Sequence, residues 1–434
     1  MIKHFYKLKK HKHYDKGLSL VKLISIVGSV QVLLQGIGFV SGILIVRMLP
    51  IQEYALYTLA NTFLGTLTIF TDSGISNGVM ALSGKVWQDP KKLGVVLATG
   101  LDLRKKFALV TLVIATPIII YLLLKNNATW LSAILIFLSL IPAFYAALSD
   151  SLLEITPKLH QDITNLQKNE IVVGLGRLLL TVLTIFIFPW TFVIILASGI
   201  PRIYGNIKLK KINDKFVDSK QKPDPIVRKE ILSIVAKILP NIVFYAVSGQ
   251  IVIWILSVFG NTNDLANIGA LGRFAALMGF FTGVLSVLFI PRFSRLQDNK
   301  ATVVKAFLFF QVILFIISGF ILLIVFLFPI QMLWILGTSY VSLSSELFLI
   351  MLANCIGVIT SMTGNLIGSR GHFLNPIVVI FLNLATVSIA YFIWDLSTLN
   401  GVLYYTIFYQ CISLLVNYIF SFNKLFLNKK VLVD

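Results

Sequence analysis

Long apolar runs alternate with short polar segments along almost the whole of the 434-residue chain. Most runs approach or exceed the roughly 20 residues that a helix needs to cross the hydrocarbon core of a bilayer. The pattern therefore predicts an all-α integral membrane protein with about twelve transmembrane helices. The predicted spans are 23–46, 54–82, 107–124, 130–153, 170–188, 190–207, 231–259, 265–290, 303–328, 343–368, 373–394 and 400–422.

Lysine and arginine gather on alternate connections between these spans. With the N-terminus placed in the cytoplasm, 32 of the 37 basic residues fall on inner segments, and only Arg47 and Lys125 fall on outer ones. An excess of basic residues in short loops marks the cytoplasmic side of a membrane. The distribution predicts that both termini are cytoplasmic, and it favours an even number of spans.

A basic segment with two prolines, 208–230, divides the chain near its middle and separates six predicted spans from six. An even number of spans in each half gives the halves the same orientation, as in parallel repeats. The predicted organisation is a basic cytoplasmic tail, a six-helix bundle, a basic cytoplasmic linker, a second six-helix bundle and a final cytoplasmic tail. These parts cover residues 1–22, 23–207, 208–230, 231–422 and 423–434.

Composition agrees with a membrane protein, because 57% of the residues are hydrophobic and only 13% are charged. The net charge of +19 raises the question of a nucleic-acid partner. A nucleic-acid binder clusters basic residues on one soluble face, whereas here they lie between apolar spans. We therefore expect membrane lipids around the chain and no nucleic acid. The two cysteines, Cys355 and Cys411, both lie inside spans and form no disulfide framework.

Small and polar residues recur at steps of three and four on several spans, which places them on one face of each helix. Glycines at this spacing are typical of close helix packing. Amides fit that explanation less well, because a lipid-facing amide is costly. Stripes from both halves indicate a shared polar cavity, and the amides expected to bind substrate there are Gln31, Gln35, Asn241, Asn354 and Gln410.

Four cations lie within or at the ends of spans at different depths. A charge near the bilayer centre costs at least about 2.5–3.5 kcal/mol, so such residues usually face a cavity or a partner. Lys237 and Arg177 lie toward the inner side, Arg273 lies toward the outer side, and Arg47 closes the first span at the outer surface. Snorkelling is the alternative for Lys237 and Arg47, and pairing with an acidic residue such as Asp72 is the alternative for Arg177.

Motifs of enzymes and of metal sites are missing from the sequence. It contains no Walker A sequence, no HExxH and no CxxC. We therefore expect no ATP hydrolysis by the chain, no catalytic residues, no metal site and no cofactor.

Three stretches resemble a known family of membrane proteins. They are RMLPIQEYALYTLANTFLGTLTIFTDSGIS at 47–76, GALGRFAALMGFFTGVLSVLFIPRFSRLQ at 269–297 and LWILGTSY at 333–340. All three look like segments of polysaccharide repeat-unit flippases of the Wzx type. The family usually has glycine after the tyrosine of the first loop, and here Ala55 follows Tyr54.

The resemblance implies a transporter of the multidrug/oligosaccharidyl-lipid/polysaccharide exporter superfamily in a bacterial cytoplasmic membrane, with two six-helix bundles around a central cavity. The implied substrate is an undecaprenyl-diphosphate-linked oligosaccharide for surface polysaccharides such as O-antigen or capsule, moved from the inner to the outer leaflet by alternating access. The implied partners are a polysaccharide polymerase and other assembly proteins.

The polar residues can be assigned roles under this hypothesis. The five amides would hydrogen-bond sugar hydroxyls, and the cations would bind diphosphate. Arg177 and Lys237 would meet the diphosphate inside, Arg273 midway and Arg47 at the exit, while Asp72 is the candidate carrier of a coupled cation. An ion-coupled multidrug exporter of the same superfamily is the alternative, although it would favour acidic over basic lining. A polymerase, a glycosyltransferase or an acyltransferase would each need residues or outer loops that are missing.

Overall fold

The computed structural model describes residues 12–296 and 299–427, and the regular elements among them are all helices. Up to the central linker the helices are α2 (Lys12–Met48), α3 (Ile51–Asp72), α4 (Ile75–Val86), α5 (Pro90–Lys125), α6 (Trp130–Leu153), α7 (Ile155–Leu159), α8 (Ile163–Ile185) and α9 (Thr191–Asn213). After the linker they are α10 (Pro225–Ser248), α11 (Ile251–Phe259), α12 (Thr262–Ser294), α13 (Lys300–Leu327), α14 (Pro329–Leu336), η1 (Thr338–Tyr340), α15 (Ser344–Gly368), α16 (Pro376–Ile393), α17 (Leu399–Phe422) and η2 (Asn423–Leu427).

Ten helical segments among the described residues are long and apolar enough to cross a membrane. They confirm the prediction of an all-α, multi-pass membrane protein. The second and fifth predicted spans are also helices, α3 and α8, of 22 and 23 residues, but they are not among the ten. The number twelve therefore stays a prediction.

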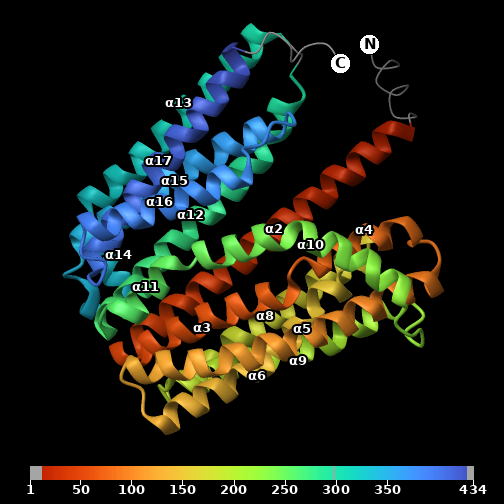
Figure 1. The fold of residues 1–434 in the computed structure, drawn as a ribbon, viewed down its shortest axis with the longest axis horizontal. Coiled ribbons are helices and arrows are strands. Elements are labelled where there is room, and N and C mark those ends of the chain that lie inside the picture. Colours follow the sequence, from red (N-terminus) through yellow and green to blue (C-terminus); the bar gives the residue numbers. More distant parts are fainter. Residues whose placement is uncertain (1–11, 297–298, 428–434) are drawn as a thin grey trace, which may run out of the picture.

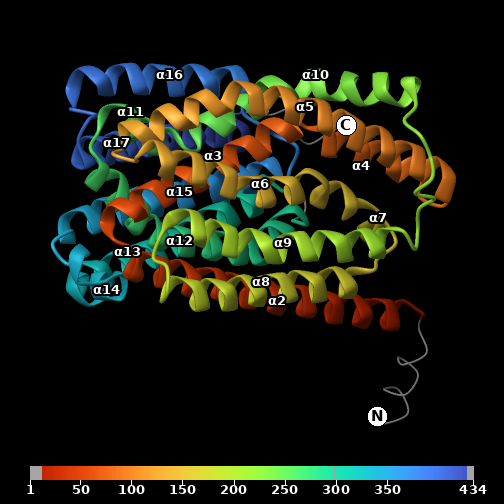
Figure 2. The same ribbon diagram turned by 90° about the horizontal axis from the view of Figure 1, so that it is seen from below.

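The helices form two arms that meet at one end and diverge toward the other (Figure 1). Helices α3 to α9 pack with one another as the first arm, and α12 to α17 form the second arm. Helix α2 contacts both arms, through α8 and α12, while α10 lies along α3, α4 and α5 and also touches α16. Figure 2 shows α2 and α10 on opposite faces of the molecule.

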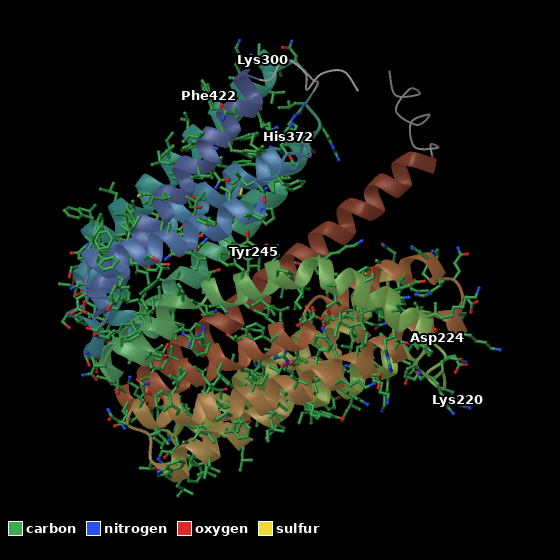
Figure 3. All side chains as sticks on the ribbon, in the orientation of Figure 1. Lys220, Asp224, Tyr245, Lys300, His372 and Phe422 are labelled. Carbon is green, nitrogen blue, oxygen red and sulfur yellow. The ribbon has the colours of Figure 1, made fainter. Side chains whose placement is uncertain are left out.

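A single apolar cluster joins the arms at their meeting end. It combines Leu59 and Phe63 of α3 with Leu271 of α12 and Leu347 of α15. At the diverging end each arm has a separate cluster of its own. We call the meeting end the outer end and the diverging end the inner end, after the predicted topology. Figure 3 shows Lys220 and Asp224 at the inner end of the first arm, apart from His372 and Lys300 on the second.

Two predicted spans are interrupted rather than continuous. The second breaks at Ser73 and Gly74, whose backbones have φ of 43° and 87°. These left-handed conformations end α3 and let α4 begin at a new angle. Gly74 is required there, because an added Cβ would collide with the side chain of Ile238 on α10. The seventh predicted span breaks between α10 and α11, at residues 249–250.

Helices cover parts of the predicted linker and of the predicted N-terminal tail. Helix α9 continues to Asn213 and α10 begins at Pro225, so only residues 214–224 connect them. Asp224 caps α10 by accepting hydrogen bonds from two backbone N–H groups, and Pro225 fits the first turn. Helix α2 starts at Lys12, within the predicted N-terminal tail, while residues 1–11 and 428–434 of the tails lie outside the described residues.

The break in α3 is held by a nearly buried arginine. Arg104 of α5 is only 3% exposed, and it forms an ion pair with Asp72 at the end of α3. Its guanidinium also donates to the Ser76 hydroxyl at 2.8 Å and to the Leu148 carbonyl of α6 at 2.9 Å. One side chain therefore links three helices and the start of α4.

We predict that Arg104→Leu lowers the thermal midpoint of the purified, detergent-solubilised protein strongly. Removing one partner of a fully buried ion pair costs about 3–5 kcal/mol, and the cost here is lower because the Asp72 side chain is 29% exposed. The matched control is Lys105→Leu, because Lys105 is the exposed neighbour on the same helix. Equal midpoints for the two variants would contradict a structural role for the Arg104–Asp72 pair.

Candidate functional site

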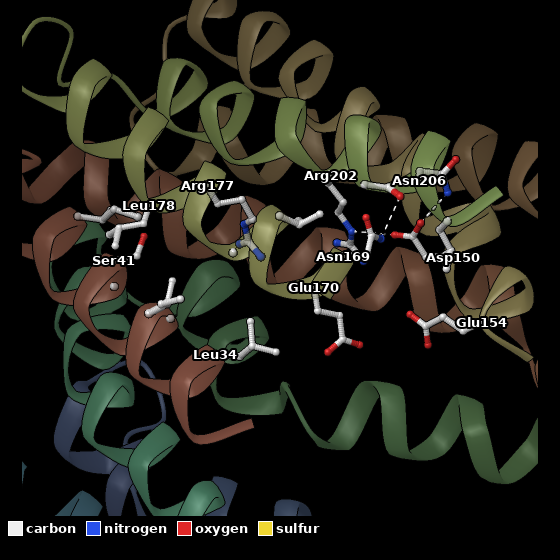
Figure 4. A pocket seen from close by; sticks show the side chains of 18 of the residues that line it. Leu34, Ser41, Asp150, Glu154, Asn169, Glu170, Arg177, Leu178, Arg202 and Asn206 are labelled. Carbon is white, nitrogen blue, oxygen red and sulfur yellow. Dashed lines mark hydrogen bonds and ion pairs between the residues drawn. The ribbon is translucent and has the colours of Figure 1, made fainter. Parts of the chain in front are cut away.

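A charged cavity of about 400 Å³ lies in the first arm (Figure 4). Its walls come from α2, α6, α8 and α9, completed by Tyr57 of α3 and Arg273 of α12. Six charged residues line this charged cavity: Asp150, Glu154, Glu170, Arg177, Arg202 and Arg273. Such a density of charge within membrane-spanning helices indicates a hydrated, substrate-accessible space.

The inner part of the charged cavity is acidic but largely compensated. Arg202 of α9 binds Asp150 of α6 with an Nε–Oδ2 distance of 3.2 Å, and Asn206 also donates to Asp150, at 2.5 Å. Glu154 pairs with Lys158 at 2.7 Å. Glu170 points into the cavity near Glu154 (Figure 4) and has no hydrogen bond or ion pair among the described residues.

The deep part of the charged cavity is basic. Arg177 lies seven residues beyond Glu170 on α8, which is about 10 Å along the helix. It has no hydrogen bond or ion pair within the described part of the chain, and its side chain is solvent-accessible inside the cavity. The deep end therefore presents a cation that the protein does not neutralise.

Arg273 reaches this cavity from the second arm. Its Nε donates to the Tyr54 hydroxyl at 3.2 Å, and its guanidinium carbon lies about 6 Å from the ring centroids of Tyr54 and Tyr57. Cation–π contact of this kind holds a guanidinium without neutralising it. Gly42 of α2 makes room, because an added Cβ would lie 3.0 Å from an Arg273 nitrogen.

A second cavity, of about 920 Å³, lies in the second arm between α10, α15, α16 and α17. Among the residues that the structure describes, those that line it include no aspartate, glutamate, lysine or arginine. Amides, hydroxyls, aromatic rings and the imidazole of His372 make up its polar surface instead. They include Asn241, Tyr245, Ser361, Asn365, Asn383, Tyr409, Gln410, Ser413 and Asn417. We call this space the neutral cavity.

The site residues that the sequence predicts are divided by the structure. Arg177 and Arg273 line the charged cavity, and Asn241 and Gln410 line the neutral cavity. Outside both cavities lie Gln31, Gln35, Arg47, Lys237 and Asn354. Arg47 lies at the outer end, with its guanidinium carbon 5.0 Å from the Trp334 ring centroid, and the Asn354 amide donates to the Ile350 carbonyl of its own helix at 2.7 Å. Roles for these five residues stay predictions.

Asp72, the predicted carrier of a coupled cation, has several protein partners. Besides the ion pair with Arg104, its carboxylate accepts from the Ser76 backbone N–H at 3.1 Å and from the Ser76 hydroxyl at 2.8 Å. It does not line either cavity. Its role in coupling stays a prediction.

Sequence reasoning missed the Asp150–Arg202–Asn206 group. Arg202 lies near the inner end of the predicted span 190–207 and counts there only as an inner basic residue, although α9 continues for about three turns beyond it. The i, i+4 spacing of Arg202 and Asn206 was the available signal, because it places both on one face of a helix. Asp150, at the inner end of α6, completes the group through tertiary packing that sequence spacing does not reveal.

Comparisons with solved structures identify the class of fold. A multidrug resistance MATE family transporter of the MOP superfamily, in an inward-facing conformation, matches with a TM-score of 0.64 at 15% identity, over 90% of this chain and 94% of that chain. A multidrug resistance MATE family transporter in an outward-facing conformation matches with a TM-score of 0.55 at 15% identity, over 92% of each chain. The lipid II flippase MurJ, in an inward closed conformation, matches with a TM-score of 0.67 at 14% identity, over 91% of this chain and 87% of that chain.

The chain therefore has the fold that MATE family transporters and the MurJ flippase share. No protein-family model and no curated protein sequence matches it. At these identities the likeness concerns architecture, so the chemistry of the two cavities must carry any argument about substrate.

We predict that both cavities are reached from the inner side of the membrane. In a Cys355→Ala, Cys411→Ala background, Ser41→Cys in the charged cavity and Ser361→Cys in the neutral cavity should react with a membrane-impermeant thiol reagent in inside-out vesicles, because the arms diverge at the inner end. The control Ser345→Cys, exposed at the outer end, should react only in right-side-out vesicles. Labelling of both cavity positions from the outside would overturn the assigned orientation.

Proposed function

We propose that the chain moves undecaprenyl-diphosphate-linked oligosaccharides from the inner to the outer leaflet of a bacterial cytoplasmic membrane, for the synthesis of surface polysaccharide. The fold of known transporters supports a transport function. The observation that carries the choice of substrate is the uncompensated cation Arg177, which lies with Arg273 at the deep end of the charged cavity.

Two arginines in one cavity, Arg177 and Arg273, have no ion pair in the described part of the chain. They favour an anionic substrate, because a site stabilises charge opposite to its own. The planar fork of a guanidinium matches the oxygens of a phosphate group. Asp150 and Glu154 already have cationic partners, so Glu170 is the one cavity carboxylate without an ion pair among the described residues. Within the described ranges, the lining residues without an ion pair are therefore two cations, Arg177 and Arg273, and one carboxylate, Glu170. Their summed charge is positive.

The physics of the membrane supports the proposed direction. An inside-negative potential favours outward movement of an anion by about 2.3 kcal/mol per charge for every 100 mV. A diphosphate head group released toward the outer side would therefore gain free energy, while the polyprenyl chain stays in hydrocarbon. Coupling to cation entry would add to this drive.

An exporter of cationic drugs is the second candidate, and Glu170 favours it. An unpaired carboxylate inside a polar cavity of an inward-open transporter is a suitable partner for an organic cation. Its position near Glu154 makes the inner part of the cavity locally acidic. This candidate predicts that Glu170, rather than Arg177, controls ligand binding.

Binding measurements on the purified protein in nanodiscs separate the two candidates. We predict that Arg177→Ala weakens binding of undecaprenyl diphosphate at least tenfold, because charge-assisted hydrogen bonds to an anion contribute about 1.5–3 kcal/mol, while Arg177→Lys retains part of the affinity. The control is Lys125→Ala, an exposed cation at the outer end of α5. Unchanged lipid binding by Arg177→Ala, together with loss of tetraphenylphosphonium binding by Glu170→Gln, would reject the flippase in favour of the drug exporter.

A further inference from the structure

The two cavities occupy corresponding places in the two halves of the chain. The charged cavity is lined by α2, α6, α8 and α9, which are the first, fourth, fifth and sixth predicted spans. The neutral cavity is lined by α10, α15, α16 and α17, which are the seventh, tenth, eleventh and twelfth. Six spans separate each pair of counterparts, so the same helices of each half form a cavity.

The two cavities differ in the charge of the residues that line them. The charged cavity has six acidic or basic residues in its lining, whereas the neutral cavity has amides, hydroxyls and His372 in the equivalent space. Equivalent cavities with different lining are suited to different parts of one ligand. A lipid-linked oligosaccharide has such parts, because its diphosphate is ionic and its neutral sugars carry only hydroxyl and amide groups.

The amides of the neutral cavity have hydrogen-bonding capacity to spare. Asn365 and Gln410 make no hydrogen bond through their side chains among the described residues, and Gln410 lies directly against Gly357. Asn383 and Asn417 each donate one N–H to a carbonyl of their own helix, at 2.9 Å, and keep the amide oxygen and the second N–H. A sugar hydroxyl both donates and accepts, as these amides do.

Aromatic rings line the same space. Tyr245 of α10 and Tyr409 of α17 line the cavity, and Phe373 and Phe420 also contribute to its wall. Aromatic faces bury the apolar C–H surface of a ligand, and the tyrosine hydroxyls remain available for hydrogen bonds. The volume of about 920 Å³ is at the upper end of the roughly 300–1,000 Å³ typical of small-molecule sites, so there is room for more than one sugar ring.

We infer that the neutral cavity is a carbohydrate subsite, which binds the sugars of the substrate while the charged cavity binds its diphosphate. This inference rests on the proposed function and adds a division of labour between the two arms. Helix α12 borders both spaces, with Arg273 in the charged cavity and Ile290 in the neutral one. Ile290 lies 17 residues beyond Arg273, which is about 25 Å along the helix, so a head group must be extended to reach both cavities.

The test compares two lipids in nanodiscs: undecaprenyl diphosphate, and the same lipid bearing a neutral tetrasaccharide. The wild-type protein should bind the glycosylated lipid at least tenfold more tightly, since a few hydrogen bonds suffice for that ratio. Asn417→Leu and Tyr409→Leu should each remove most of this advantage. The control is Thr406→Val, because Thr406 lies on α17 outside the cavity and bonds to the Val402 carbonyl of its own helix.

The outcomes distinguish this inference from the proposed function. If neither lipid binds the wild-type protein, the proposed function fails. If both lipids bind through Arg177 but the tetrasaccharide adds no affinity, or adds the same affinity in all three variants, the carbohydrate subsite is wrong. Tetraphenylphosphonium binding that depends on Tyr409, without any effect of sugar, would instead identify a cation–π site for organic cations. Circular dichroism and gel filtration of each variant establish that it is folded.

Discussion

The whole architecture depends on the contact between α3 and α12 at the outer end, where one apolar cluster serves both arms. The helices approach so closely there that an added Cβ at Gly269 would collide with the Thr58 side chain. Arg273 and Tyr54 form a hydrogen bond across the same junction. Because each arm has its own core further inward, the arms can separate at the inner end without unfolding. The junction thus joins two stable bundles that diverge at the inner end.

The arrangement of cavities follows from this junction. The charged cavity ends at Arg273 and Tyr57, beside the outer junction, so a ligand that enters from the inner end meets a closed outer side. Under the proposed division of labour, a single substrate would be bound by the first arm through its diphosphate and by the second arm through its sugars. Such a substrate would draw the inner ends together. Closure of the inner end by a bridging ligand is the physical step that alternating access requires.

Much of the fold could be predicted from hydropathy, because bilayer thickness fixes the length of a spanning helix. Breaks within the predicted spans were harder to predict. The residues of α3 and α4 form one largely apolar run in the sequence, and hydropathy does not indicate the left-handed backbone at Ser73 and Gly74. The site was predictable only in part. The predicted polar stripe of α2 contains Gln31, Gln35, Gly38 and Gly42, but periodicity does not say what each part of a face meets. Gly38 and Gly42 line the charged cavity, whereas Gln31 and Gln35 do not.

Charged residues near helix ends were the least predictable. Arg104 and Arg202 both count only as inner basic residues in the sequence, yet Arg104 is almost fully buried and Arg202 lines the charged cavity. Their partners, Asp72 and Asp150, lie 32 and 52 residues away in the chain. Only tertiary packing brings such groups together. A count of charges along the sequence therefore uses both arginines as evidence for membrane orientation and does not reveal their partners.

The most direct measurement is the distribution of lipid-linked oligosaccharides between the leaflets in cells that lack this gene. The proposed function predicts that undecaprenyl-diphosphate oligosaccharides accumulate in the inner leaflet and that surface polysaccharide is lost. Restoration of the wild-type gene should reverse both effects. A normal leaflet distribution and normal surface polysaccharide in the deletion strain would contradict the proposal.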